Sequence, residues 1–300
     1  MNEQQNPVTR DVTVSGFDGA TLSALLVHRP DVQPRALPHG SHPLLCLPGH
    51  LRPARTLLPF MEAMVERDDG PGVAVALDYR GRGGSEPRGD AGLYTPSAEA
   101  KDVVSVVDAL GLHHVDLIAD GRGGLVAMSL YPARPGLIRR LVLNDIGPEL
   151  DGVGLARLRL TAQRDAVPSS WDVATAALKE AQENRYPALD DRDWERFARL
   201  VWREEDGRPA RAVHEEVAEH FAAIDTDERY PSLWPEFEAL REIPTLLLRA
   251  EHGDMVSERT LERMRTAHPK LSVEEVAGQG HTPLLHVGDL TERVAAFLSN

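Results

Sequence analysis

Short apolar segments alternate with segments of helical periodicity along most of this 300-residue chain. Residues 97–112, for example, lie between two apolar segments and repeat valine and leucine at helical spacing. Strands that are apolar almost throughout are typical of a sheet buried on both faces, with the intervening helices as its cover. The alternation therefore predicts an α/β fold, a mostly parallel sheet with helices on both faces, whose strands are expected at 43–49, 72–78, 114–120, 137–145, 243–251 and 271–278.

The N-terminal region has a different pattern. Residues 10–30 alternate apolar and polar side chains on both sides of Asp18-Gly19, and Asp-Gly is a strong signal for a two-residue hairpin turn. We therefore expect an antiparallel hairpin ahead of the parallel sheet. The composition of residues 31–42 predicts a loop after it.

The alternation of strands and helices breaks between about residues 147 and 240. This stretch contains helix-period segments and no convincing strand, and it holds all four tryptophans of the chain. We interpret residues 148–240 as an inserted helical cap, over a core domain formed by residues 1–147 and 241–300. The tryptophans are expected to form a small core of the cap, with the lining of a ligand pocket as the alternative.

Charge and cysteine content restrict the class of protein. The formal net charge of −14 disfavours binding to nucleic acid or anionic lipid and favours neutral or cationic small partners. Cys46 is the only cysteine, so the chain has no internal disulfide and no cysteine metal cluster, and we expect no metal or other cofactor. No signal peptide and no run of about 18 apolar residues is present. These features predict a cytoplasmic protein that takes a small-molecule substrate or ligand.

Polar groups follow several predicted strands, at the sheet edge where open α/β sheets place their sites. The stretches are LPGHLR at 47–52, DYRGRGGS at 78–85, LVLNDIGP at 141–148, RAEHGDMVS at 249–257 and GQGHTPLLH at 278–286. Together and in this order they resemble the α/β-hydrolase family, in particular its capped ester, lactone and C–C bond hydrolases. The resemblance extends from about Leu44 to the C-terminus.

The resemblance implies roles for individual residues. His281 matches the catalytic histidine of the family, and Asp254 matches the acid that orients it through a hydrogen bond. Asp145 is the alternative acid, because some members carry it after the strand at that place in the chain. The backbone N–H groups of His50 and Arg122 match the oxyanion-hole donors.

The remaining family motif, the nucleophile elbow, is degenerate. The family pattern Gly-x-Ser-x-Gly-Gly aligns with residues 119–124, Ala-Asp-Gly-Arg-Gly-Gly, so Gly121 occupies the place of the nucleophile. A glycine cannot attack a carbonyl. A shifted register would make Asp120 the nucleophile, but it would put Ile118 and Arg122 where the turn needs small residues. The tetrapeptide GRGG also occurs at 81–84, and because its flanks differ we treat the repetition as coincidental.

Three functions are compatible with this sequence. The first is an enzyme without a covalent step, in which His281 activates water or moves protons on a small apolar carbonyl substrate. The second is a catalytically inactive relative, a pseudoenzyme that binds a small molecule or regulates another protein. The third is a dinucleotide-binding protein, since Asp145 lies 22 residues after Gly123, near the spacing of a ribose-binding acid. The dinucleotide-binding hypothesis is weakened because Val126 occupies the position of the third glycine in the dinucleotide-binding motif.

Overall fold

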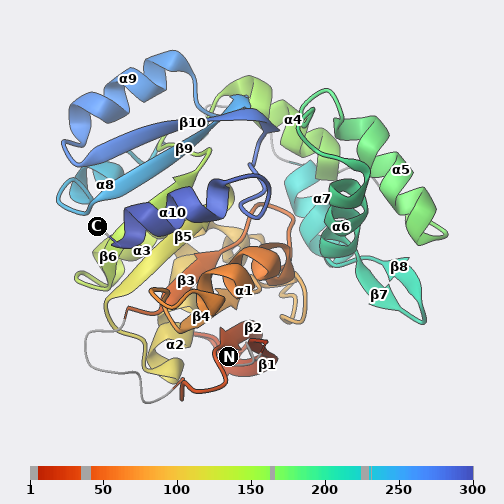
Figure 1. The fold of residues 1–300 in the computed structure, drawn as a ribbon, viewed down its shortest axis with the longest axis horizontal. Helices are drawn as coiled ribbons and strands as arrows, with labels where there is room; N and C mark the ends of the chain where they lie inside the picture. The colour runs from red at the N-terminus through yellow and green to blue at the C-terminus, as the bar shows by residue number, and fades with distance from the viewer. Residues whose placement is uncertain (1–5, 35–41, 163–165, 224–229, 231, 300) are drawn as a thin grey trace.

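A computed structural model describes residues 6–34, 42–162, 166–223, 230 and 232–299. Eight of its strands form one sheet in the order β1-β2-β4-β3-β5-β6-β9-β10 (Figure 1). All neighbours from β4 to β10 are parallel, and β1 and β2 are antiparallel. The predicted α/β fold is confirmed, with strand bounds β1 Val8–Ser15, β2 Thr21–His28, β3 Leu44–Leu47, β4 Val73–Leu77, β5 Val115–Asp120, β6 Ile138–Asn144, β9 Thr245–His252 and β10 Leu271–Gly280.

The predicted N-terminal hairpin is present. β1 and β2 pair from Val8 opposite His28 to Ser15 opposite Thr21. Gly19 has a φ of +84°, a conformation that glycine adopts without a steric penalty, so the Asp-Gly pair explains the turn. Most of the loop predicted at 31–42 lies outside the described residues.

Two apolar layers cover the faces of the sheet and explain why its central strands lack polar alternation. In β5, Leu117 packs into the layer that holds α2 and α3, whereas Ile118 packs into the opposite layer with α1 and α10. Cys46 of β3 also lies in the second layer and is fully buried, as its apolar neighbours predict. The helix bounds are α1 Leu58–Glu66, α2 Pro96–Leu110, α3 Arg122–Ala133, α9 Glu258–Ala267 and α10 Leu290–Ser299, with short 3₁₀ turns at Ala54–Leu57 and Ala91–Tyr94.

The segment between β6 and β9 is mainly helical, as predicted. Its elements are α4 Gly152–Ala162, α5 Trp171–Gln182, α6 Asp191–Val201, β7 Arg203–Glu205, β8 Arg208–Ala210, α7 Glu215–Ala222 and α8 Trp234–Ala239. In Figure 1, α4 to α7 lie beside the sheet, while α8 lies with the core helices. The hairpin β7–β8 was not predicted, because its strands have only three residues each and no apolar alternation.

The tryptophans do not share one core, so that interpretation is wrong. Trp194 packs with Tyr186 and Phe197 in a small cluster of the inserted segment. Trp234 instead packs with the α3 layer of the main core. The ring of Trp171 lies under the guanidinium of Arg199.

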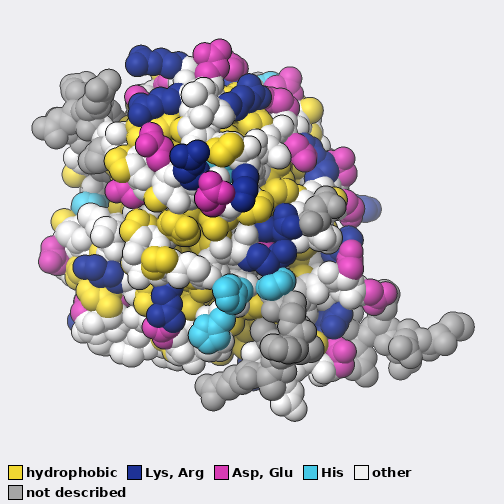
Figure 2. Space-filling model, turned by 90° about the vertical axis from the view of Figure 1, so that its left-hand side faces the viewer, with side chains coloured by type: hydrophobic (Ala, Val, Ile, Leu, Met, Phe, Trp, Pro, Cys, Tyr) yellow, Lys and Arg dark blue, Asp and Glu magenta, His cyan; other side chains and the backbone are white. Residues whose placement is uncertain are grey.

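The surface gives little direction about partners. Figure 2 shows one face on which acidic and basic side chains are interspersed among small apolar areas. None of the helices in the described ranges combines the length and the apolar character needed to cross a membrane.

Candidate functional site

The site begins at the sharp turn from β5 into α3. Gly121 forms this turn with φ +48° and ψ −111°, a conformation rarely open to residues with a side chain. The next two glycines are required by close packing. A Cβ at Gly123 would lie 2.3 Å from the carbonyl oxygen of Leu47, and one at Gly124 would lie 2.2 Å from Cγ2 of Ile146. The predicted tight turn is therefore present, with Gly121 at its apex.

His281 faces this turn from the end of β10. Its Nδ1 lies 3.0 Å from Oδ2 of Asp145, and both side chains are buried. Because a carboxylate only accepts hydrogen bonds, the proton of the neutral imidazole lies on Nδ1, which leaves the lone pair on Nε2. A Cβ placed on Gly121 would lie 3.2 Å from Nε2, so the basic nitrogen points at the apex of the turn.

Asp145 is held rigidly after β6. Its Oδ1 accepts a hydrogen bond of 3.0 Å from the backbone N–H of Ala250, while Oδ2 bonds to His281. A Cβ on Gly253 would lie 2.6 Å from the same carboxylate, which is why the neighbouring loop carries a glycine there. With both oxygens engaged, Asp145 is positioned to orient the imidazole and not to bind a ribose.

The predicted hydrogen bond between Asp254 and His281 is wrong. Asp254 receives a bidentate pair from Arg157, at 2.7 and 2.8 Å, and a third bond from Arg185 at 3.0 Å. Burial raises the pKa of this carboxyl, but the two arginines outweigh burial and lower it overall. Asp145 and Asp254 follow adjacent strands at the same sheet edge, so the order of motifs could not distinguish the two carboxylates.

The two predicted oxyanion donors come from different segments of the chain. His50 follows β3, and Arg122 is the first residue of α3, where backbone N–H groups have no acceptor within the helix. The imidazole of His50 packs edge-on against Phe221, with ring centroids 4.1 Å apart. Burial, and then the charges of Arg122 and Arg82, hold the pKa of His50 well below its usual value, so this ring is neutral.

A buried ionic cluster connects these two donors. Glu99 bonds to Arg122 at 2.8 Å through one oxygen and contacts Arg82 at 3.1 Å through the other. Arg82 also donates to the carbonyl oxygen of His50, at 3.2 Å. The arginines of the two GRGG tetrapeptides therefore share the carboxylate of Glu99. No motif in the sequence indicated this contact, because Glu99 lies within α2.

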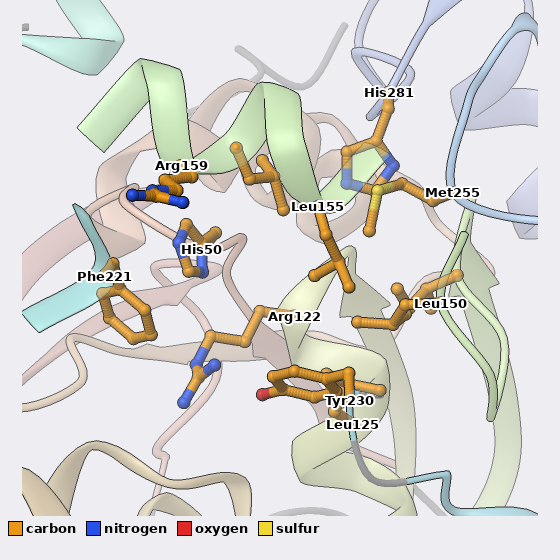
Figure 3. Close-up of a pocket in the computed structure, with 12 residues that line it drawn as sticks. His50, Arg122, Leu125, Leu150, Leu155, Arg159, Phe221, Tyr230, Met255 and His281 are labelled. Atoms are coloured by element: carbon orange, nitrogen blue, oxygen red, sulfur yellow. The ribbon is translucent and has the colours of Figure 1, made fainter. Parts of the chain in front are cut away.

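A pocket opens beside the turn and His281 (Figure 3). The space between its lining atoms amounts to about 460 Å³ when the solvent at its open mouth is included, and only a small part of that space is enclosed. The walls are mainly apolar and the polar groups are few, as is typical of small-molecule sites. The described lining residues are His50, Arg122, Leu125, Ile146, Leu150, Leu155, Leu158, Arg159, Phe221, Tyr230, Met255 and His281.

A family model described as alpha/beta hydrolase fold matches residues 74–286. The chain belongs to this family. It is 26% identical over 221 residues to a 3-hydroxybutyrate-oligomer hydrolase of Cupriavidus necator, which covers 70% of this chain and 73% of the relative.

Solved structures of other α/β-hydrolases have the same fold as this chain. An alpha/beta hydrolase from Novosphingobium aromaticivorans superposes with a TM-score of 0.84 at 28% identity, covering 97% of this chain and 98% of the other. The enol-lactonase from Burkholderia xenovorans has a TM-score of 0.66 at 16% identity, covering 96% of this chain and all of the other.

Asp120 does not occupy the apex of the α/β-hydrolase turn. It is the last residue of β5 and is buried, and its Oδ1 accepts a hydrogen bond of 2.7 Å from Asn144. Asp78 also has a structural role, because it accepts bonds from the backbone N–H groups of Ala54 and Gly84. Among the described residues, no group of three or more histidine, cysteine or acidic side chains could hold a metal ion.

Proposed function

We propose that this α/β-hydrolase-family chain is an enzyme that works without a covalent intermediate on a small carbonyl substrate. The observation that supports the proposal most directly is the buried His281–Asp145 pair, whose free nitrogen faces the apex of the turn. Such a pair is the general-base half of a catalytic triad. An inactive protein has no chemical requirement for a buried imidazole oriented by a carboxylate.

Gly121 is, in this proposal, a degenerate nucleophile position. The φ and ψ angles of Gly121, and the 3.2 Å between its hypothetical Cβ and Nε2 of His281, support the assignment. Since glycine has no side-chain oxygen, no acyl-enzyme can form. The reacting oxygen has to come from water.

His281 also indicates where this water would bind. A water oxygen hydrogen-bonded to Nε2 would lie about 2.7–3.0 Å from that nitrogen, on the side of the ring that faces the turn. The imidazole takes a proton from the water as its oxygen attacks the carbonyl carbon. The oxygen of the tetrahedral intermediate receives hydrogen bonds from the backbone N–H groups of His50 and Arg122. The leaving group then departs with the proton held on His281.

The alternative is an inactive relative that binds a small molecule in the pocket. The lack of a side-chain nucleophile at Gly121 favours this alternative. The largely apolar walls would hold a ligand in either case.

Hydrolysis of a panel of p-nitrophenyl esters and lactones distinguishes the two. The proposal expects slow turnover without a burst of p-nitrophenol, and its loss in His281→Ala. His113→Ala is the control, because His113 is exposed and outside the pocket. Turnover that survives in His281→Ala contradicts the proposal. If neither the native protein nor Gly121→Ser turns over any member, the inactive alternative holds for this substrate class.

A further inference from the structure

The pocket carries a charge opposite to that of the chain as a whole. The net charge of the protein is −14, yet the described lining residues include two arginines, Arg122 and Arg159, and no Asp or Glu. Arginines are among the side chains best suited to bind a carboxylate, because the guanidinium matches it in shape and charge. The lining therefore favours an anionic ligand, whereas the composition of the whole chain favours neutral or cationic partners.

The guanidinium of Arg159 has hydrogen-bond donors available for a ligand. Arg159 lies in the last turn of α4, and its Nε donates to the carbonyl oxygen of Ala222 at 3.0 Å. Within the described ranges, neither terminal nitrogen of Arg159 has a hydrogen-bond partner. Figure 3 shows Arg159 on the side of the pocket away from His281, with His50 between Arg159 and Arg122.

The charged groups close to the pocket carry a net positive charge, because each of two carboxylates is shared by two arginines. Glu99 is shared by Arg82 and Arg122, and Asp254 is shared by Arg157 and Arg185. Each group of two arginines and one carboxylate carries one positive charge. Glu99, Arg82 and Arg122 are buried, where charges are poorly screened by solvent.

We propose that the pocket binds a carbonyl compound that also carries a carboxylate, and that Arg159 pairs with this carboxylate. The substrate would lie along the apolar wall formed by Leu155 and Leu158, with its carboxylate at Arg159 and its carbonyl at His281. Arg122 does not pair with the carboxylate directly, because its Nε bonds to Glu99 and one terminal nitrogen bonds to the carbonyl oxygen of Tyr94. Its positive charge still favours an anion in the pocket. This inference rests on the proposed function for the identity of the reacting end.

Binding of hexanoate and of its neutral counterpart hexanamide tests the inference by calorimetry at pH 7.5. Hexanoate is expected to bind at least about tenfold more tightly, because a hydrogen bond to a charged group contributes more than a neutral one. Arg159→Gln should weaken hexanoate binding by about 10- to 100-fold and leave hexanamide nearly unchanged, while Arg159→Lys should lose less. The control is Arg192→Gln, an exposed arginine of α6 outside the pocket.

Equal binding of the two probes, or an unchanged preference in Arg159→Gln, overturns the inference. The same titrations on His281→Ala separate this inference from the proposed function. His281→Ala should keep the preference for hexanoate even though it lacks the general base. If hexanoate is preferred but no ester is hydrolysed, the carboxylate site stands and the proposed reaction fails.

Discussion

His281 and Asp145 share a hydrogen bond of 3.0 Å between Nδ1 and Oδ2, although 136 residues separate them in the chain. The bond joins the ends of β6 and β10, which are not neighbours in the sheet, since β9 lies between them. Asp145 reaches His281 past β9 with its backbone in a left-handed conformation, φ +54°. A non-glycine residue at positive φ costs free energy that the surrounding contacts must offset. The bonds from Ala250 and His281 offset it here.

Asp145→Asn should lower kcat for any ester that the native protein hydrolyses by about 10²- to 10⁴-fold, because the amide no longer fixes the tautomer of His281. Asp254→Asn should lower kcat by less than about tenfold, since Asp254 bonds to Arg157 and Arg185 and not to the histidine. Steady-state rates of the two variants, at equal folded fraction by circular dichroism, make the comparison. Larger damage from Asp254→Asn would mean that the acid has been assigned to the wrong residue.

Gly121→Ser should lower the free energy of unfolding by about 1–3 kcal/mol, the usual cost of a strained backbone conformation for a residue with a side chain. The new Cβ would also lie 3.0 Å from Cγ2 of Thr282, so the loop bearing His281 has to shift slightly. Urea denaturation measures the change.

Gly121→Ala is the matched control, because it adds the same Cβ without the hydroxyl. Equal destabilisation by both variants supports backbone strain as the cause. A burst of product in Gly121→Ser alone would identify the hydroxyl as a restored nucleophile. A variant more stable than the native protein would refute the strain argument.

The sequence predicted the sheet well because its central strands are buried on both faces. Ile118 and Leu117 contact opposite layers, so burial leaves a continuous apolar run that is visible without a structure. The family resemblance also predicted His281 at the end of the last strand, with Asp254 as its partner and Asp145 as the alternative. The structure pairs His281 with Asp145, and the sequence could not make this choice because both aspartates follow neighbouring strands and only side-chain geometry distinguishes them.

The ionic cluster was missed for a different reason. Arg82, Glu99 and Arg122 come from three separate segments, and Glu99 has no motif around it. Long-range pairing of charges leaves no periodic pattern in a sequence, unlike the packing of a helix or strand. The structure alone reveals that both GRGG loops contact the same carboxylate.

Glu99→Gln should lower the free energy of unfolding by about 3–5 kcal/mol, because it leaves two buried arginines without their shared counter-charge. Glu195→Gln is the matched control. Its partner Arg199 is on the surface and both side chains are about half exposed, so its loss should cost less than about 1 kcal/mol. Chemical denaturation at pH 7 gives both values. Similar small losses would show that Glu99 is not needed to neutralise the cluster.

Stability should also fall on mild acidification through His286. Burial, and then the charge of Arg196, lower the pKa of His286 to about 4, from an ordinary value of about 6.5. A histidine with a depressed pKa binds its proton more readily in the unfolded chain. The contribution of His286 is therefore constant above about pH 6.5 and becomes increasingly destabilising as the pH falls toward 4.

The loss from this residue reaches the order of 3 kcal/mol at pH 4, because each tenfold difference in proton affinity between the folded and unfolded chain corresponds to about 1.4 kcal/mol. His286→Asn removes the titrating group, so its free energy of unfolding should depend less steeply on pH between 6.5 and 4 than that of the native protein. The pKa values of His50 and His220 are also lowered by burial and nearby arginines, so a smaller slope should remain. His113→Asn, at an exposed position, should leave the native slope unchanged. Equal slopes for His286→Asn and the native protein would show that the buried imidazole does not control this pH dependence.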